Sequence, residues 1–175
     1  MTGTRDITRG TLVLPGEGVP IRMGALPADL LAPAAFSGGA YELHEQPVPP
    51  GVLVVPHHHA HQDQISVVTA GTLGVLVGDE EFVAPVGSCV LRPRGVVHAL
   101  WNASPEPARM IEVSSPGAGI EAFFRRFTDL TVAGTATSSA IAELARPYGI
   151  TYRPDLVAGL EKRHGVSAGG GWWQE

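Results

Sequence analysis

Short stretches of alternating apolar and polar residues run through the middle of the chain. Between residues 40 and 115 each stretch is four to seven residues long and is bounded by Gly, Pro, Asp or Asn. This is the pattern of half-buried β-strands joined by turns. The predicted strands cover residues 40–46, 51–57, 64–70, 72–78, 81–84, 88–92, 97–102 and 108–114. Many short antiparallel strands at this spacing predict an all-β sandwich or barrel.

The residues before this region are rich in Gly, Pro and Ala. We expect residues 1–39 to form an N-terminal arm with one or two short strands, the first at Thr11–Leu14 and the second, where there are two, at Ile21–Met23, followed by a loop over residues 27–39. Such an arm can pair with a barrel edge or with a partner subunit, because a bare strand edge promotes association.

The period becomes helical after Pro116. Ile120, Phe123, Phe124 and Phe127 recur at the spacing of one helix face and predict a helix over residues 118–128. Two further helices are expected, one over residues 139–146 capped by Ser138 or Ser139, and one from Pro154 to about His164. The tail from residue 165 is expected to be loose up to Trp172 and Trp173. The chain therefore divides into an arm (1–39), a barrel (40–115) and a C-terminal helical extension (116–175) packed on the barrel.

Composition narrows the classes of partner. The 175 residues suit one domain, and the formal net charge of −5 without any Lys/Arg-rich run argues against a nucleic-acid partner. We also expect no membrane partner, since no apolar stretch reaches 18 residues and the N-terminus lacks the features of a signal peptide. Cys89 is the only cysteine, so no intrachain disulfide forms. A cytoplasmic protein that acts on a small molecule is the simplest interpretation.

Two long motifs carry the candidate chemistry. The first runs Gly51-x5-His57-x-His59-x4-Gln64-x6-Gly71. Residues two apart in a strand point to the same face, so His57 and His59 can both point into a barrel. Neutral imidazoles are common metal ligands, and two of them in an apolar interior need a metal or a hydrogen-bonding partner.

The second motif runs Gly87-x5-Pro93-x-Gly95-x2-His98-x3-Asn102. Pro93 and Gly95 predict a tight turn that leads His98 into the next strand. A third imidazole from across the barrel would complete a three-histidine facet. Such a facet leaves coordination positions open for water or substrate, which is typical of catalytic metal sites.

The two motifs, separated by residues 72–86, resemble the two signature motifs of the cupin superfamily. The resemblance implies a jelly-roll barrel, or double-stranded β-helix, that binds one divalent transition metal (Fe, Mn, Ni or Zn). It implies His57, His59 and His98 as ligands, with Gln64 in the position of the fourth. The segments from Gly95 to Phe127 and around residues 145–150 are similar to monocupins of the quercetin 2,3-dioxygenase-like group.

The chain departs from the family pattern at Gln64, where cupins usually have Glu. Gln64 is either a weak metal ligand or an amide that hydrogen-bonds a ligand histidine without touching the metal. An amide cannot accept a proton at neutral pH, so the general base has to lie elsewhere. The candidates are Glu42, His44, His61 and Glu112.

Three functions follow from this pattern. By resemblance the first is a metal-dependent dioxygenase that acts on a small aromatic, polyketide-like or enolisable substrate. Because Gln64 leaves the metal more cationic, the second is a non-oxidative isomerase, cyclase or lyase in which the metal acts as a Lewis acid. The third is a non-catalytic cupin that binds a small molecule. The resemblance also implies a homodimer.

Overall fold

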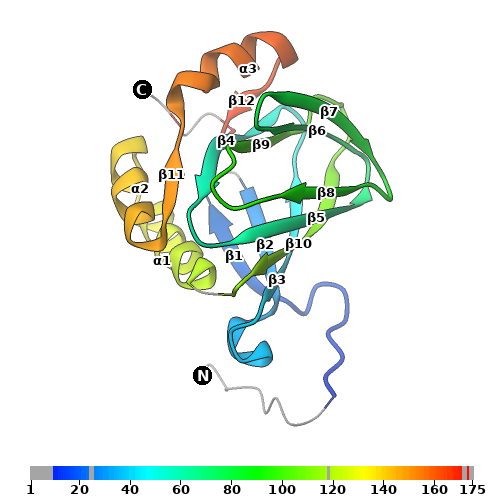
Figure 1. Cartoon of the computed structure of the whole chain (residues 1–175), viewed down its shortest axis with the longest axis vertical. Coiled ribbons are helices and arrows are strands. Elements are labelled where there is room, and N and C mark those ends of the chain that lie inside the picture. The colour runs from blue at the N-terminus through cyan, green and yellow to red at the C-terminus, as the bar shows by residue number, and fades with distance from the viewer. Residues whose placement is uncertain (1–9, 24–25, 118, 171–172, 174–175) are drawn as a thin grey trace.

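Two facing β-sheets enclose the interior of the protein (Figure 1). The computed structural model describes residues 10–23, 26–117, 119–170 and 173. One sheet has the strand order β1-β2-β3-β10-β5-β8 and is called sheet A below. The other, sheet B, has the order β11-β4-β9-β6-β7, and β12 also pairs with β4. The predicted all-β cupin barrel, a double-stranded β-helix with C-terminal helices, is confirmed.

The strands are β1 (Val19–Met23), β2 (Leu26–Ala32), β3 (Glu42–Val48), β4 (Val52–His59), β5 (Asp63–Ala70), β6 (Thr72–Val77), β7 (Glu80–Pro85), β8 (Cys89–Arg92), β9 (His98–Trp101), β10 (Ala108–Ser115), β11 (Ile150–Tyr152) and β12 (Ser167–Ala168). The helices are α1 (Ile120–Val132), α2 (Ser138–Ala145) and α3 (Val157–His164), with 3-10 turns at Ala34–Ser37, Arg146–Tyr148 and Pro154–Leu156. All eight strands predicted between residues 40 and 115 are present, each within three residues of its predicted ends.

The N-terminal segment differs from its prediction. Residues 11–14 form no strand, while the predicted loop over residues 27–39 contains the seven-residue strand β2. β2 pairs with β1 on one side and with β3 on the other, so both strands extend sheet A. Pro27 and Pro33 suggested a loop, but Leu26, Ala28 and Leu30 alternate as buried residues and the apolar interior holds the strand in place. The division into arm, barrel and extension stays a prediction.

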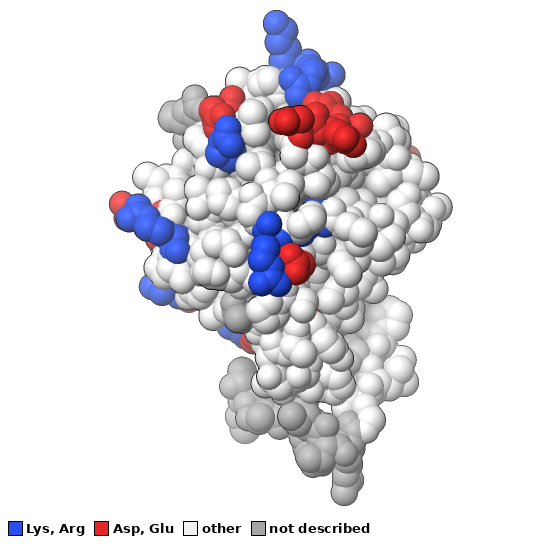
Figure 2. Space-filling view, in the orientation of Figure 1, with Lys and Arg blue, Asp and Glu red and all other residues white. Residues whose placement is uncertain are grey.

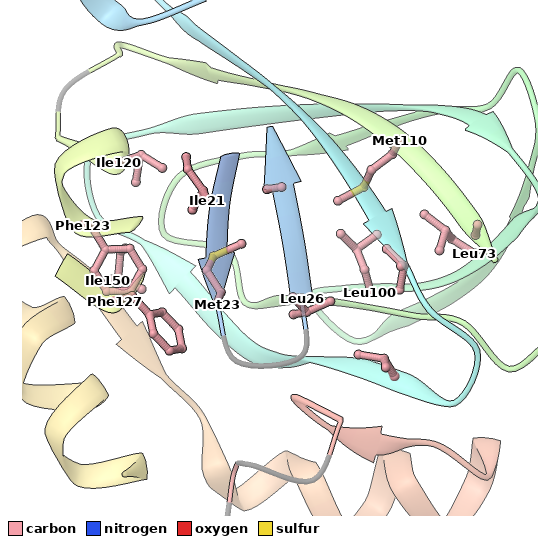
Figure 3. Close-up of a cluster of buried hydrophobic side chains, with 14 of the residues drawn as sticks. Ile21, Met23, Leu26, Leu73, Leu100, Met110, Ile120, Phe123, Phe127 and Ile150 are labelled. Atoms are coloured by element: carbon pink, nitrogen blue, oxygen red, sulfur yellow. The ribbon is translucent and has the colours of Figure 1, made fainter. Parts of the chain in front are cut away.

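Helix α1 closes one end of the barrel. Its buried residues Ile120, Phe123 and Phe127 belong to the main hydrophobic core, where Figure 3 shows the two phenylalanines near Ile150 of β11. The Thr128 hydroxyl donates to the backbone carbonyl of Arg22 at 2.9 Å and accepts from its N–H at 3.0 Å. These two hydrogen bonds connect α1 to β1.

The helical predictions need two corrections. The cap of α2 is Thr137, whose hydroxyl accepts from the N–H of Ala140, rather than Ser138 or Ser139. Residues 167–168, in the tail predicted to be loose, form β12 and pair in parallel with β4, and Trp173 is buried against Tyr152. Trp172 lies outside the described residues.

Charged side chains are sparse on the face drawn in Figure 2, where acidic and basic groups lie beside each other in small clusters. Near α3, Glu81 accepts from Arg163 at 2.5 Å and lies 2.9 Å from the His164 ring, which fastens the helix to β7. Within the described ranges, none of the helices is long and apolar enough to span a membrane.

Candidate metal centre

Three imidazoles from two neighbouring strands of sheet B meet inside the barrel. His57 and His59 project from the same face of β4, and His98 of β9 is the register partner of His57. The ring centroids lie 5.0 Å apart for His57 and His59, 4.5 Å for His57 and His98, and 5.5 Å for His59 and His98. One ring nitrogen from each residue falls within 4.8 Å of the others, close enough for the three to share one metal ion.

The hydrogen bonds of the rings favour metal binding. His57 Nδ1 lies 2.7 Å from the Val55 carbonyl oxygen, and His98 Nδ1 lies 3.1 Å from that of Val96. A carbonyl only accepts, so each Nδ1 carries the proton and each Nε2 keeps its lone pair free for a metal. His98 Nε2 is buried without a hydrogen-bond partner. Both acceptors are backbone carbonyls two positions earlier, in β4 for Val55 and in the bend before β9 for Val96, so the local backbone orients the rings.

Burial keeps the three imidazoles neutral. It lowers the pKa of His57 to about 4 and that of His59 to about 2, and it lowers the pKa of His98 well below the usual 6.5. Repulsion among the rings and from Arg92 adds to the effect at His59 and His98. At neutral pH the triad therefore presents the deprotonated form that binds metals, and its donor chemistry fits a divalent transition metal.

Gln64 lies on the opposite sheet and is only 3% exposed. Its Nε2 donates to Glu112 Oε1 at 2.9 Å and to the Ser114 hydroxyl at 3.3 Å. Its Oε1 is buried without a partner, although Gln64 lines the same cavity as His57 and His59. The amide is thus oriented so that its oxygen remains available to a ligand.

Two predicted bases are buried away from the cavity wall. Glu42 accepts from the backbone N–H of Glu121 at 3.4 Å, at the start of α1, and burial raises its pKa to about 7. His44 packs edge-on against Phe124 with ring centroids 5.2 Å apart. Neither is among the residues that line the cavity.

The other two candidates lie in contrasting positions. His61 is exposed in the bend between β4 and β5, against Gly149, and does not line the cavity. Glu112 does line it and forms a buried ion pair with Arg92, with Glu112 Oε2 2.6 Å from Arg92 Nη2. Although burial opposes ionisation, Arg92 holds the pKa of Glu112 below its usual value. The structure therefore brings one of the four candidates to the site.

Arg92 is a cavity residue that the sequence interpretation missed. It lies on β8, is 2% exposed, and donates to both Glu112 and the Ser66 hydroxyl, the latter at 2.5 Å. A signal was present in β5, where Gln64 and Ser66 alternate with Ile65 and Val67. The polar pair faces inward and the apolar pair is more than a third exposed, the reverse of an ordinary barrel strand. Such inverted alternation indicates a polar interior.

The cavity is small. Its volume is about 60 Å³, which is enough for a metal ion and one functional group but too small for a large substrate. Its lining residues are Met23, Leu26, Gln46, Val54, Val55, His57, His59, Gln64, Arg92, Leu100, Glu112, Phe123, Phe124, Phe127, Ile150 and Tyr152.

With its β-barrel and inward-facing histidine triad, this protein falls in the class of candidate metal-binding barrel proteins. Residues 44–114 match the family model described as Cupin domain, a range that includes both motifs. This part of the chain is therefore similar to the Cupin domain family, and the barrel fold agrees with that similarity. The narrower resemblance to quercetin 2,3-dioxygenase-like monocupins stays a prediction.

Solved structures share the barrel at low sequence identity. A Cupin 2 conserved barrel domain protein from Salinispora arenicola is 22% identical with a TM-score of 0.53 and covers 69% of this chain and 98% of its own. A predicted oxalate decarboxylase from Thermotoga maritima is 18% identical, with a TM-score of 0.56 and coverages of 61% and 99%. KdgF from Halomonas sp. is 19% identical, with a TM-score of 0.55 and coverages of 62% and 94%. No curated protein matches the chain.

Proposed function

We propose that this protein is a metal-dependent enzyme that catalyses non-oxidative proton transfer, as in isomerisation, cyclisation or elimination, on a small enolisable substrate. The observation that supports this most is the donor set. Among the described residues, the metal-binding cluster consists of three neutral imidazoles without a carboxylate, and the amide oxygen of Gln64, which has no hydrogen-bond partner, lies at the wall of the same cavity. Glu112, the nearby carboxylate, is already paired with Arg92.

The charge of this site favours an anionic ligand. Neutral donors leave the full charge of a divalent ion uncompensated, and the Arg92–Glu112 pair adds no net charge. A divalent Fe, Mn, Ni or Zn ion would supply Lewis acidity toward a carbonyl, enol or phenol oxygen. A substrate that becomes an enolate or phenolate would therefore be stabilised as its negative charge develops.

The surrounding residues have separate roles in this proposal. Gln64 directs its oxygen toward the reacting group and is held there by its bond to Glu112. Glu112 is the candidate base, since its ionised carboxylate is at the cavity wall, and Arg92 fixes its orientation. Phe123, Phe124 and Phe127 exclude water from the same cavity, which strengthens these electrostatic interactions.

The proposal is tested by following proton exchange without oxygen. Metal content is first measured on protein from its native source. The metal-loaded protein is then incubated anaerobically in D2O with a panel of 2-oxo acids and phenols, and loss of the acidic C–H signals is followed by NMR. We expect exchange with at least one 2-oxo acid, none with its methyl ester, and loss of exchange in His98→Ala.

Other outcomes would separate the alternatives. Turnover that requires oxygen and consumes it would favour the dioxygenase branch and overturn the non-oxidative proposal. Tight binding of panel members without exchange or oxygen uptake would favour a non-catalytic binding protein.

We also propose a homodimer. Apolar side chains are exposed on three strands at or next to the sheet edges, namely Ile65 and Val67 of β5, Phe82 and Val83 of β7, and Leu91 of β8. Burying such a surface against a second copy would remove it from water. Sedimentation should give a dimer that Leu91→Glu weakens, and a monomeric native protein would contradict the proposal.

A further inference from the structure

A second hollow lies directly beside the candidate metal cavity. It is a cleft of about 490 Å³ between α2, β11 and the C-terminal Trp173, on the side where Figure 1 shows α2 next to β11. Tyr152 and Ile150 of β11 line both hollows. The Tyr152 ring lies 5.7 Å from the His57 ring. The side chains of Tyr152 and Ile150 therefore separate the cleft from the triad.

The volumes of the two hollows suggest that they bind different parts of one substrate. Binding sites for small organic molecules commonly have a volume of about 300–1,000 Å³. The cleft falls in this range, while the cavity at the triad has only about 60 Å³. If the reacting group of a substrate enters the cavity, the rest of the substrate has to lie outside it, and the cleft shares a wall with the cavity.

The cleft has the chemistry of a site for an aromatic group. Tyr152 and Trp173 form an aromatic pair with ring centroids 5.0 Å apart, and both line it. The small side chain of Ala142 of α2 also lines the cleft, and Ser138 and Arg146 supply polar groups. Aromatic side chains favour offset or edge contacts with another ring, beyond the gain from burying its surface.

We propose that this cleft binds an aromatic part of the substrate, while Tyr152 and Ile150 form the gate through which the oxygen-bearing group reaches the triad. The inference rests on the proposed function and adds a substrate class to it, a compound with an aryl group joined by a short linker to a metal-binding oxygen group. Tyr152 would act as a specificity-determining residue that contacts the ring and borders His57.

A pair of probes separates the cleft from the metal site. Acetohydroxamate carries a metal-binding group alone, and 3-phenylpropanohydroxamate carries the same group with a linked ring. Binding of each to the zinc-loaded protein is measured by calorimetry. We expect the aryl probe to bind about tenfold more tightly, a modest fraction of the gain from burying a phenyl ring.

The informative variant fills the cleft. Ala142→Trp places an indole in the cleft, and Ala158→Trp, at an exposed position of α3, is the matched control. We expect Ala142→Trp to remove the tenfold advantage of the aryl probe and to leave acetohydroxamate affinity unchanged. Ala158→Trp should keep both affinities, and thermal melting verifies that both variants are folded.

Four results would overturn the inference. An aryl advantage that survives Ala142→Trp, or no aryl advantage in the native protein, would place the ring elsewhere while leaving the metal site intact. An equal loss of both probes in folded Ala142→Trp would show that the cleft does not bind the ring separately from the metal-binding group. If neither probe bound the native protein, the metal site would fail and this inference with it.

Discussion

The buried ion pair between Arg92 and Glu112 gives the most direct test of the polar interior. Glu112→Gln keeps the shape of the side chain and an oxygen that can accept from Gln64, but removes the negative charge. The Arg92 guanidinium would then remain in the barrel wall, 2% exposed, without a counter-ion. We expect the substitution to destabilise the fold through that uncompensated charge.

The expected magnitude follows from the burial of both side chains. The Arg92 and Glu112 side chains are 2% and 6% exposed and meet at 2.6 Å. Removing one partner of such a pair typically costs about 3–5 kcal/mol. Asp63 and Arg94 meet at a similar 2.7 Å, yet their side chains are 49% and 50% exposed. Asp63→Asn is therefore the matched control, and it should cost much less stability because solvent screens the exposed pair.

Urea unfolding at pH 7 measures the free energy of unfolding of both variants against the native protein. The pH dependence gives an independent check. Because the pKa of Glu112 is lowered in the folded state, its contribution is present above the usual value of 4.5 and is lost as the pH falls through the folded pKa. The gap between native protein and Glu112→Gln should thus narrow in acid. A cost no larger than that of Asp63→Asn would refute the reasoning.

Three further predictions concern single positions. Gly74→Ala should lower the melting temperature, with a cost of about 1–3 kcal/mol or more, since a Cβ would meet the Trp101 ring at 2.0 Å; an unchanged melting curve would contradict this packing. The free energy of unfolding of Glu42→Gln, measured in urea, should equal that of the native protein near pH 4.5 and exceed it by up to about 3 kcal/mol at pH 8.5. The native carboxyl has its pKa raised to about 7, and its contribution is lost as the pH rises through that value; a constant difference across this range would argue against a titrating Glu42. Gln64→Glu should increase the thermal stabilisation by added zinc, because the new carboxylate meets Glu112 without metal and can ligate the metal when it is present. An unchanged zinc effect would place residue 64 outside the coordination sphere.

The sequence predicted the central barrel and the triad because both depend on local spacing. Alternation along each strand determines which face is buried, and it puts His57 and His59 on one side of β4 whatever the neighbouring strand is. The second motif places His98 at the start of another strand, which the structure pairs directly with β4 rather than across the barrel. The side-chain period of two and the tight turn at Pro93 and Gly95 predicted the strands, and the resemblance to the cupin motifs implied that the three histidines meet.

The parts that the sequence did not predict depend on contacts between distant segments. β2 is stabilised by β3 and the core rather than by its own proline-containing sequence. The position of Arg92 follows from register, because β8 pairs Arg92 with Gln64 on β5. The separation of Glu112 from the other three base candidates likewise required the three-dimensional arrangement, since all four are polar residues near the same motifs.

The pairing of β4 has a consequence for synthesis on the ribosome. A nascent chain that has emerged through β10 already contains all three histidines, but the flanks that β11 and β12 supply to β4 are still to be made. Until then β4 presents an open edge, which favours pairing with other chains. Metal captured at this stage would meet a site still open to water, so early capture could fasten β4 to β9 before the helices close the barrel end.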